Sequence, residues 1–117
     1  MKKAYHLSTC STCSRILKEI NASDFLLQDI KHEAITEAQL DQIYTYTSSY
    51  EALFSKRALK YKSMGLKDKN LQEEDFKRLI LQEYTFLKRP VFLINDEVYV
   101  GNSKNVVEAV KNILANE

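Results

Sequence analysis

The fold is decided by one stretch at the start of the chain, KKAYHLSTCSTCSRILKEINASDFLLQDI, residues 2–30. Residues 2–7 are predicted to form a short strand, and residues 24–30 a second strand of the compact, buried type. Between them, the apolar residues Cys13, Ile16, Leu17 and Ile20 have the spacing of an amphipathic helix. Since strand, helix and strand follow within about 30 residues, the two strands are expected to be parallel.

The middle of the chain has the patterns of three helices. Thr36 and Gln39 form a capping-box pattern at the start of the first helix. Gly65 is predicted to end the second, and the acidic residues 73–75 suit the positive end of the third. The expected apolar faces are Leu40, Ile43 and Tyr44 in the first, Tyr50, Leu53, Phe54 and Tyr61 in the second, and Phe76, Leu79, Ile80, Tyr84 and Leu87 in the third.

The pattern changes after Pro90. Residues 91–95 and 98–100 are rich in residues that favour strands, and a hairpin turn is expected at Asp96-Glu97. A last helix follows, capped by Asn102 or Ser103. The order β-α-β, helices, β-β-α predicts an α/β, thioredoxin-like fold with an all-helical insertion between strands 2 and 3. We expect one domain over residues 1–117, with the insertion at about 35–88.

Length and composition narrow the class of protein. With 117 residues and a net charge of +1, the chain gives no indication of bulk affinity for nucleic acid or membranes. No stretch approaches the roughly 20 apolar residues of a membrane span. The N-terminus lacks the long apolar run and cleavage site of a signal peptide. These features predict a cytoplasmic protein.

The two cysteines, Cys10 and Cys13, are expected to differ. Cys13 lies on the apolar stripe of the helix, so its sulfur is predicted to face the interior. Cys10 lies at or before the first helical turn, where unpaired N–H groups and the helix dipole favour a thiolate. The pattern therefore predicts an exposed nucleophile and an inner resolving thiol. The alternatives are two incidental thiols or a zinc site, which would lack ligands at the required spacing, so no metal is expected.

Three further residues are candidates for the same site. Pro90, the only proline, stands directly before a strand. Most X–Pro bonds are trans, and an ordinary strand-entry proline is the alternative. In thioredoxin-like proteins, however, a cis-proline at this point packs against the C-x-x-C pair, and that likeness implies a cis bond here. Arg89 precedes Pro90 and is expected near the cysteines, where a guanidinium can stabilise a thiolate or bind an oxyanion. Arg57 falls on the predicted apolar stripe of the second middle helix, so it either reaches the solvent or serves the site.

Three segments together carry a family resemblance: YHLSTCSTCSRILKEI (5–20), YEALFSKRALKY (50–61) and FLKRPVFLINDEVYVG (86–101). The chain resembles the ArsC/Spx family, the arsenate-reductase-like branch of thioredoxin-fold proteins, over essentially its whole length. The resemblance implies a catalytic or sensing cysteine at Cys10. It also implies an oxyanion ligand at Arg89, no bound cofactor, and reduction by glutathione, glutaredoxin or thioredoxin.

The resemblance leaves two functions open. The first is a thiol–disulfide oxidoreductase acting on an oxyanion or disulfide substrate. Two arginines of arsenate reductases lack clear matches here, since Ser55 and the segment 101–103 occupy their places. The second is a Spx-like redox-sensing regulator that binds RNA polymerase without turnover. Against it, Ser48 lies at about the position where Spx proteins have the glycine that contacts the polymerase. The basic residues available for such a contact are Lys56, Arg57, Lys60 and Lys62. We favour the oxidoreductase.

Overall fold

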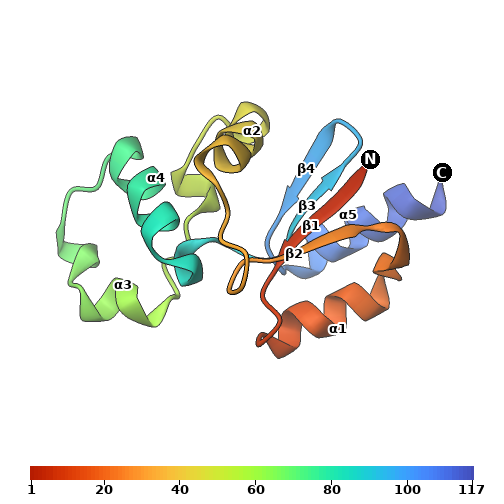
Figure 1. Cartoon of the computed structure of the whole chain (residues 1–117), viewed down its shortest axis with the longest axis horizontal. Coiled ribbons are helices and arrows are strands. Elements are labelled where there is room, and N and C mark those ends of the chain that lie inside the picture. The colour runs from red at the N-terminus through yellow and green to blue at the C-terminus, as the bar shows by residue number, and fades with distance from the viewer. The chain divides into compact units, whose positions relative to one another are not determined.

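The computed structural model describes all residues, 1–117, and its contacts divide the chain into two compact units. The first unit consists of Met1–Glu33 and Arg89–Glu117, and the second is the intervening segment Ala34–Lys88. The first contains all four strands of the sheet and two α-helices, and the second is mainly helical and contributes no strand to the sheet (Figure 1). The predicted α/β order, with helices between the second and third strands, is therefore confirmed.

The first unit is built on a four-stranded mixed sheet. Its strands are β1 (Lys2–His6), β2 (Leu26–Asp29), β3 (Val91–Ile94) and β4 (Glu97–Val100), in the spatial order β2-β1-β3-β4. β1 and β2 are parallel, as the strand–helix–strand pattern predicted. β3 is antiparallel to both of its neighbours. The end of β1, which leads to the cysteines, therefore lies beside the end of β2 and the start of β3.

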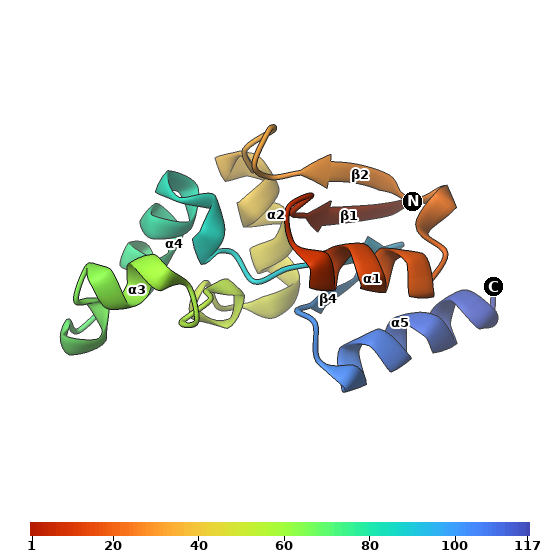
Figure 2. The same ribbon diagram turned by 90° about the horizontal axis from the view of Figure 1, so that it is seen from below.

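Helices α1 (Ser11–Glu19) and α5 (Lys104–Ala115) cover one face of this sheet (Figure 2). The predicted apolar face of α1 and the valines of α5 supply their contacts with the sheet, because residues three or four positions apart lie on one side of a helix. Ser103 caps α5 as expected, its Oγ accepting a hydrogen bond from the Val106 N–H at 3.2 Å. The buried residues of the resulting core are Ala4, Ile16, Ile20, Phe25, Phe92, Ile94, Val107 and Val110.

β2 differs from its prediction as a buried strand. It is an edge strand of four residues, preceded by a 3-10 turn at Ala22–Asp24. Leu26 and Leu27 are 63% and 50% exposed, whereas the polar Gln28 is 3% exposed. The prediction of a buried strand is wrong for Leu26 and Leu27, because β2 lies at the edge of the sheet and pairs only with β1.

The turn of the β3–β4 hairpin lies one residue earlier than predicted. It consists of Asn95 and Asp96, and Glu97 already belongs to β4, where it pairs with Ile94. Asn95 has a φ of 56°, in the left-handed region. Asparagine tolerates this conformation better than most residues, which is why the tight turn begins there.

The second unit contains helices α2 (Glu37–Thr47), α3 (Leu59–Ser63) and α4 (Glu73–Gln82). Short 3-10 turns connect them at Glu51–Leu53 and Leu66–Asp68, and another follows α4 at Tyr84–Phe86. Gly65 follows the end of α3 with a φ of 66°, a left-handed conformation that suits glycine at a helix C-terminus, as predicted. The longest helix of the chain has 12 residues, and none is long and apolar enough to span a membrane.

The predicted helix through residues 50–61 is wrong, because long-range backbone pairing makes its centre extended. Phe54 forms an isolated antiparallel bridge with Leu87. The Ser55 N–H donates to the Phe86 carbonyl at 2.7 Å, and the Lys88 N–H to the Leu53 carbonyl at 2.8 Å. The same pairing explains why α4 ends at Gln82, before the predicted Tyr84 and Leu87. The Phe54 ring packs against Phe76 and Phe86 at centroid distances of 5.0 and 4.8 Å.

Candidate active site

The candidate site begins at the turn that connects β1 to α1. The Cys10 N–H donates to the Leu7 carbonyl at 3.0 Å, which closes a turn over Ser8 and Thr9. Cys10 is the N-cap of α1, with extended backbone angles, and its carbonyl accepts the first helical hydrogen bond from Ser14 at 3.1 Å. Its side chain is partly exposed. The predicted position of Cys10 at the start of the helix is therefore confirmed.

The surroundings of Cys10 favour its thiolate. Its partial burial opposes ionisation. Hydrogen bonds from the Cys13 N–H, the Cys13 thiol and the Thr12 N–H outweigh this cost, with the positive charge of Arg89 adding to them, and they hold the pKa of Cys10 below its usual value. The first turn of α1 contains no acidic residue that would compete for these donors. A helix N-terminus that contacts a thiol in this way stabilises the anion.

Cys13 has the opposite environment. It is fully buried beneath the helix, as its place on the apolar stripe predicted. Burial raises the pKa of Cys13 to about 11; a hydrogen bond from the Leu7 backbone opposes the change, and the negative charge of Cys10 adds to it. Both cysteines are free thiols in this structure. No group of three or more His, Cys, Asp or Glu residues gathers where it could hold a metal ion.

The segment before β3 brings a positive charge to the two thiols. The Arg89–Pro90 peptide bond is cis, as the sequence predicted. Pro90 is buried, and its carbonyl accepts a hydrogen bond from the Gly101 N–H at 2.9 Å. The charge of Arg89 lowers the pKa of both Cys10 and Cys13. Arg89 is therefore close enough to influence both cysteines, although it is far from them in the sequence.

Arg57 is the one predicted site residue that lies in the second unit. It is exposed in the turn between the 3-10 segment Glu51–Leu53 and α3. The helical stripe from which its orientation was inferred does not exist, because residues 54–58 are not helical. A role for Arg57 as an anion ligand stays a prediction.

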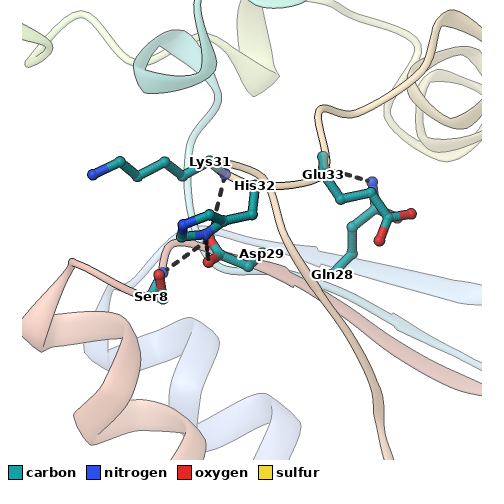
Figure 3. Close-up of polar contacts among 6 residues, drawn as sticks. All are labelled: Ser8, Gln28, Asp29, Lys31, His32 and Glu33. Atoms are coloured by element: carbon teal, nitrogen blue, oxygen red, sulfur yellow. Dashed lines mark hydrogen bonds and ion pairs between the residues drawn. The ribbon is translucent and has the colours of Figure 1, made fainter.

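A polar cluster that was not predicted from the sequence lies at the end of β2 (Figure 3). Asp29 Oδ1 accepts hydrogen bonds from the backbone N–H groups of Ser8 at 3.1 Å and Lys31 at 3.3 Å. Asp29 Oδ2 lies 2.6 Å from Nδ1 of His32. Partial burial opposes ionisation, but the contacts with Ser8, His32 and Lys31 hold the pKa of Asp29 far below its usual value. The position of Asp29 beside the end of β1 could have been predicted, because the carboxyl ends of parallel strands meet at one edge of a sheet.

Several proteins of known structure share this fold. A model of the ArsC family matches residues 5–110 of the chain. An ArsC family related protein from Bacteroides fragilis has a similar structure, with a TM-score of 0.77, 21% identity, and coverage of 93% of this chain and 96% of that one. For an arsenate reductase from Vibrio cholerae the TM-score is 0.76, with 16% identity and 96% coverage of both chains. For a protein from Staphylococcus aureus the TM-score is 0.72, with 24% identity and coverage of 93% and 97%.

These likenesses confirm the predicted thioredoxin-like fold with its helical insertion. No curated protein sequence matches the chain significantly.

Proposed function

Since the chain belongs to the ArsC family, we propose that it is a cytoplasmic thiol–disulfide oxidoreductase with Cys10 as the nucleophile and Cys13 as the resolving thiol. One observation carries this proposal: two cysteines three residues apart have opposite ionisation behaviour. The pKa of Cys10 is lowered at the helix N-terminus, whereas burial raises the pKa of Cys13 to about 11. An accessible thiolate beside a protonated inner thiol is the arrangement needed for two successive sulfur attacks.

The reaction with a disulfide substrate has two steps. The Cys10 thiolate attacks one substrate sulfur, so that a mixed disulfide forms and the other substrate sulfur leaves as a thiolate. Cys13 then loses its proton and attacks the Cys10 sulfur, forming the Cys10–Cys13 disulfide and releasing the second substrate thiol. Two electrons pass from the protein to the substrate. Glutathione, glutaredoxin or a thioredoxin-type protein would supply the two electrons that restore the dithiol.

An oxyanion is the other substrate class that fits this site. The Arg89 guanidinium can hold an anionic substrate beside Cys10 through paired N–H donors. Pro90 would shape the wall of the site next to the cysteines. We keep Arg57 as a second proposed anion ligand, tested by whether Arg57→Gln raises the KM for arsenate without changing the reaction with a neutral disulfide.

A redox-sensing regulator that binds RNA polymerase is the second candidate. Its contact surface would be the basic residues Lys56, Arg57, Lys60 and Lys62. Two of these four already form ion pairs within the second unit: Lys56 lies 2.8 Å from Glu51, and Lys60 lies 2.5 Å from Glu83. Such pairing is typical of a solvated surface. We therefore prefer the enzyme, and polymerase capture without turnover would favour the regulator.

The proposal is tested by thiol titration and turnover in the same protein. The rate of iodoacetamide alkylation is measured against pH for wild type, Cys10→Ser and Cys13→Ser. Turnover of arsenate and of hydroxyethyl disulfide is measured with glutathione plus glutaredoxin and with thioredoxin. We expect one fast-reacting thiol, lost in Cys10→Ser, and a stable mixed disulfide in Cys13→Ser. A Cys10 pKa at or above the usual thiol value of about 8.5 would rule the proposal out.

A further inference from the structure

The Asp29 cluster holds the turn that carries Cys10. Ser8 lies two residues before Cys10, inside the turn closed by the Cys10 N–H and the Leu7 carbonyl. Its backbone N–H donates to Asp29 Oδ1 at 3.1 Å, and its hydroxyl also hydrogen-bonds to the Asp29 carboxylate. A side chain from β2 therefore fixes the middle of the β1–α1 turn.

The carboxylate of Asp29 is itself held in place. His32 contacts Oδ2 through Nδ1 at 2.6 Å, and the Lys31 N–H donates to Oδ1 at 3.3 Å. The backbone following Asp29 folds back over it, with the Glu33 N–H donating to the Asp29 carbonyl at 2.8 Å. Figure 3 shows Ser8 and His32 converging on this one carboxylate. A side chain fixed from both sides can transmit its position to the turn it holds.

We propose that Asp29 is a positioning residue for the nucleophile: by holding the Ser8 backbone, its carboxylate fixes the turn that places the Cys10 sulfur against the N–H groups of α1. This inference rests on the proposed function of Cys10. It matters chemically because the hydrogen bonds from Thr12 and Cys13 to the Cys10 sulfur depend on the orientation of the N-cap. A loosened turn would let the sulfur turn away, and the thiolate would lose its donors.

The alternative is that Asp29 acts on Cys10 through its charge alone. A nearby negative charge disfavours a thiolate, so removing it would make Cys10 more acidic. Positioning has the opposite sign, because loss of the carboxylate would make Cys10 less acidic. The direction of the change therefore distinguishes the two effects.

The experiment compares Asp29→Ala, Asp29→Asn and Ser8→Ala in the full chain. Its readouts are the pH profile of Cys10 alkylation by iodoacetamide and the hydrogen exchange of the Ser8 amide. We expect Asp29→Ala to slow alkylation at pH 7 by about two- to tenfold, the range that corresponds to one net hydrogen bond. The profile should move to higher pH and the Ser8 amide should exchange faster. Asp29→Asn keeps an acceptor oxygen and should change both less.

Two control variants separate positioning from general destabilisation. Lys31→Ala keeps the backbone N–H that contacts Asp29, so its profile should match wild type. Val110→Ala opens a small cavity in the core of the first unit, where Val110 is fully buried, and should lower the melting temperature without moving the profile. If Asp29→Ala does not fold, Asp29→Asn decides the question through the same two readouts, because Ser8→Ala keeps the backbone N–H that donates to Asp29 and removes only the hydroxyl contact.

The outcomes separate this inference from the proposed function. An activated Cys10 in wild type whose profile is unchanged, or moves to lower pH, in the Asp29 variants overturns positioning alone. A wild-type Cys10 that titrates as an ordinary thiol overturns the proposed function, and positioning with it. A shift to higher pH in Asp29→Ala, smaller in Asp29→Asn and absent in both controls, supports positioning.

Discussion

Helices α1 and α2 both begin with backbone N–H groups that lack partners within the helix, but different side chains cap these groups. At α2, Thr36 Oγ1 accepts from the Gln39 N–H at 3.1 Å, and Gln39 Oε1 accepts from the Thr36 N–H at 3.0 Å. Glu37 adds a negative charge to the first turn. At α1 the N-cap is Cys10. A neutral thiol is only a weak hydrogen-bond acceptor, and the first turn has no acidic residue.

This difference separates stabilisation from reactivity. The first N–H groups of every helix lack partners within the helix, and an N-cap side chain normally accepts from one of them. At α2 the side chains of Thr36 and Gln39 accept from these N–H groups whatever the pH. At α1 the corresponding groups gain a strong acceptor when Cys10 loses its proton, so the helix stabilises the form that reacts. A weaker cap is thus the condition for an activated sulfur.

Cys10→Ser tests this trade-off most strongly. Serine is a good N-cap but its hydroxyl does not ionise at neutral pH, so turnover should fall on the order of a thousandfold or more. The free energy of unfolding should rise by about 0.5–1 kcal/mol, because the hydroxyl can accept from the first turn. Turnover assays and urea unfolding of the two proteins measure both changes. Retained turnover, or a less stable variant, would contradict the comparison.

The pH dependence of the resolving step should show the second-largest effect. With the pKa of Cys13 at about 11, its reactive thiolate is a fraction of roughly one in ten thousand at pH 7. Raising the pH to 9 increases that fraction, so release of a mixed disulfide should accelerate by up to about a hundredfold. The gain is smaller to the extent that the Cys10 charge, absent from the mixed disulfide, contributes to the raised pKa. Stopped-flow release of a chromogenic thiol measures the rate, and a pH-independent rate would contradict the assignment of Cys13.

Local patterns in the sequence predicted much of this site. The helical spacing of Cys13, Ile16 and Ile20 was sufficient to place the Cys13 sulfur in the interior. It also placed Cys10, three positions earlier, at the start of the helix. The capping box at Thr36 and the cis bond before Pro90 were also predicted correctly. The helix features depend on residues that are neighbours in the chain. The cis bond was instead expected because Pro90 and the C-x-x-C pair together follow a thioredoxin-like pattern.

The errors arose where distant segments decide the structure. The exposure of Leu26 and Leu27 depends on the edge position of β2, which no local pattern reveals. The break in the predicted helix at Phe54 depends on pairing with Leu87, more than thirty positions away. The contact of Asp29 with Ser8 likewise depends on parallel strands ending side by side. Local periodicity is a weak guide when tertiary hydrogen bonds compete with it.

Arg89→Met should have the third-largest effect. The charge of Arg89 lowers the pKa of Cys10, so its removal should move the alkylation profile to higher pH and slow alkylation at pH 7 severalfold. Arg89→Lys keeps the charge and should recover most of the rate. Lys88→Met removes an exposed neighbouring charge and serves as the matched control. Equal changes in the Arg89 and Lys88 variants would show that net charge, rather than the placement of Arg89, sets the reactivity of Cys10.

Thr36→Ala should have the smallest effect, and on stability alone. The change removes the hydroxyl that accepts from the Gln39 N–H, so the free energy of unfolding should fall by about 1 kcal/mol. Thr45→Ala, on the same helix, leaves the cap intact and places a better helix former at an exposed site, so it should be neutral or slightly stabilising. Urea unfolding measures both changes.

Neither variant should move the pH profile of Cys10, because the cap of α2 serves its own helix. A Thr36→Ala profile displaced to higher pH would mean that the two N-termini are coupled. The stability of the helical insertion would then influence the reactivity of Cys10. The capping of α2 and the reactivity at the N-terminus of α1 could no longer be treated as independent.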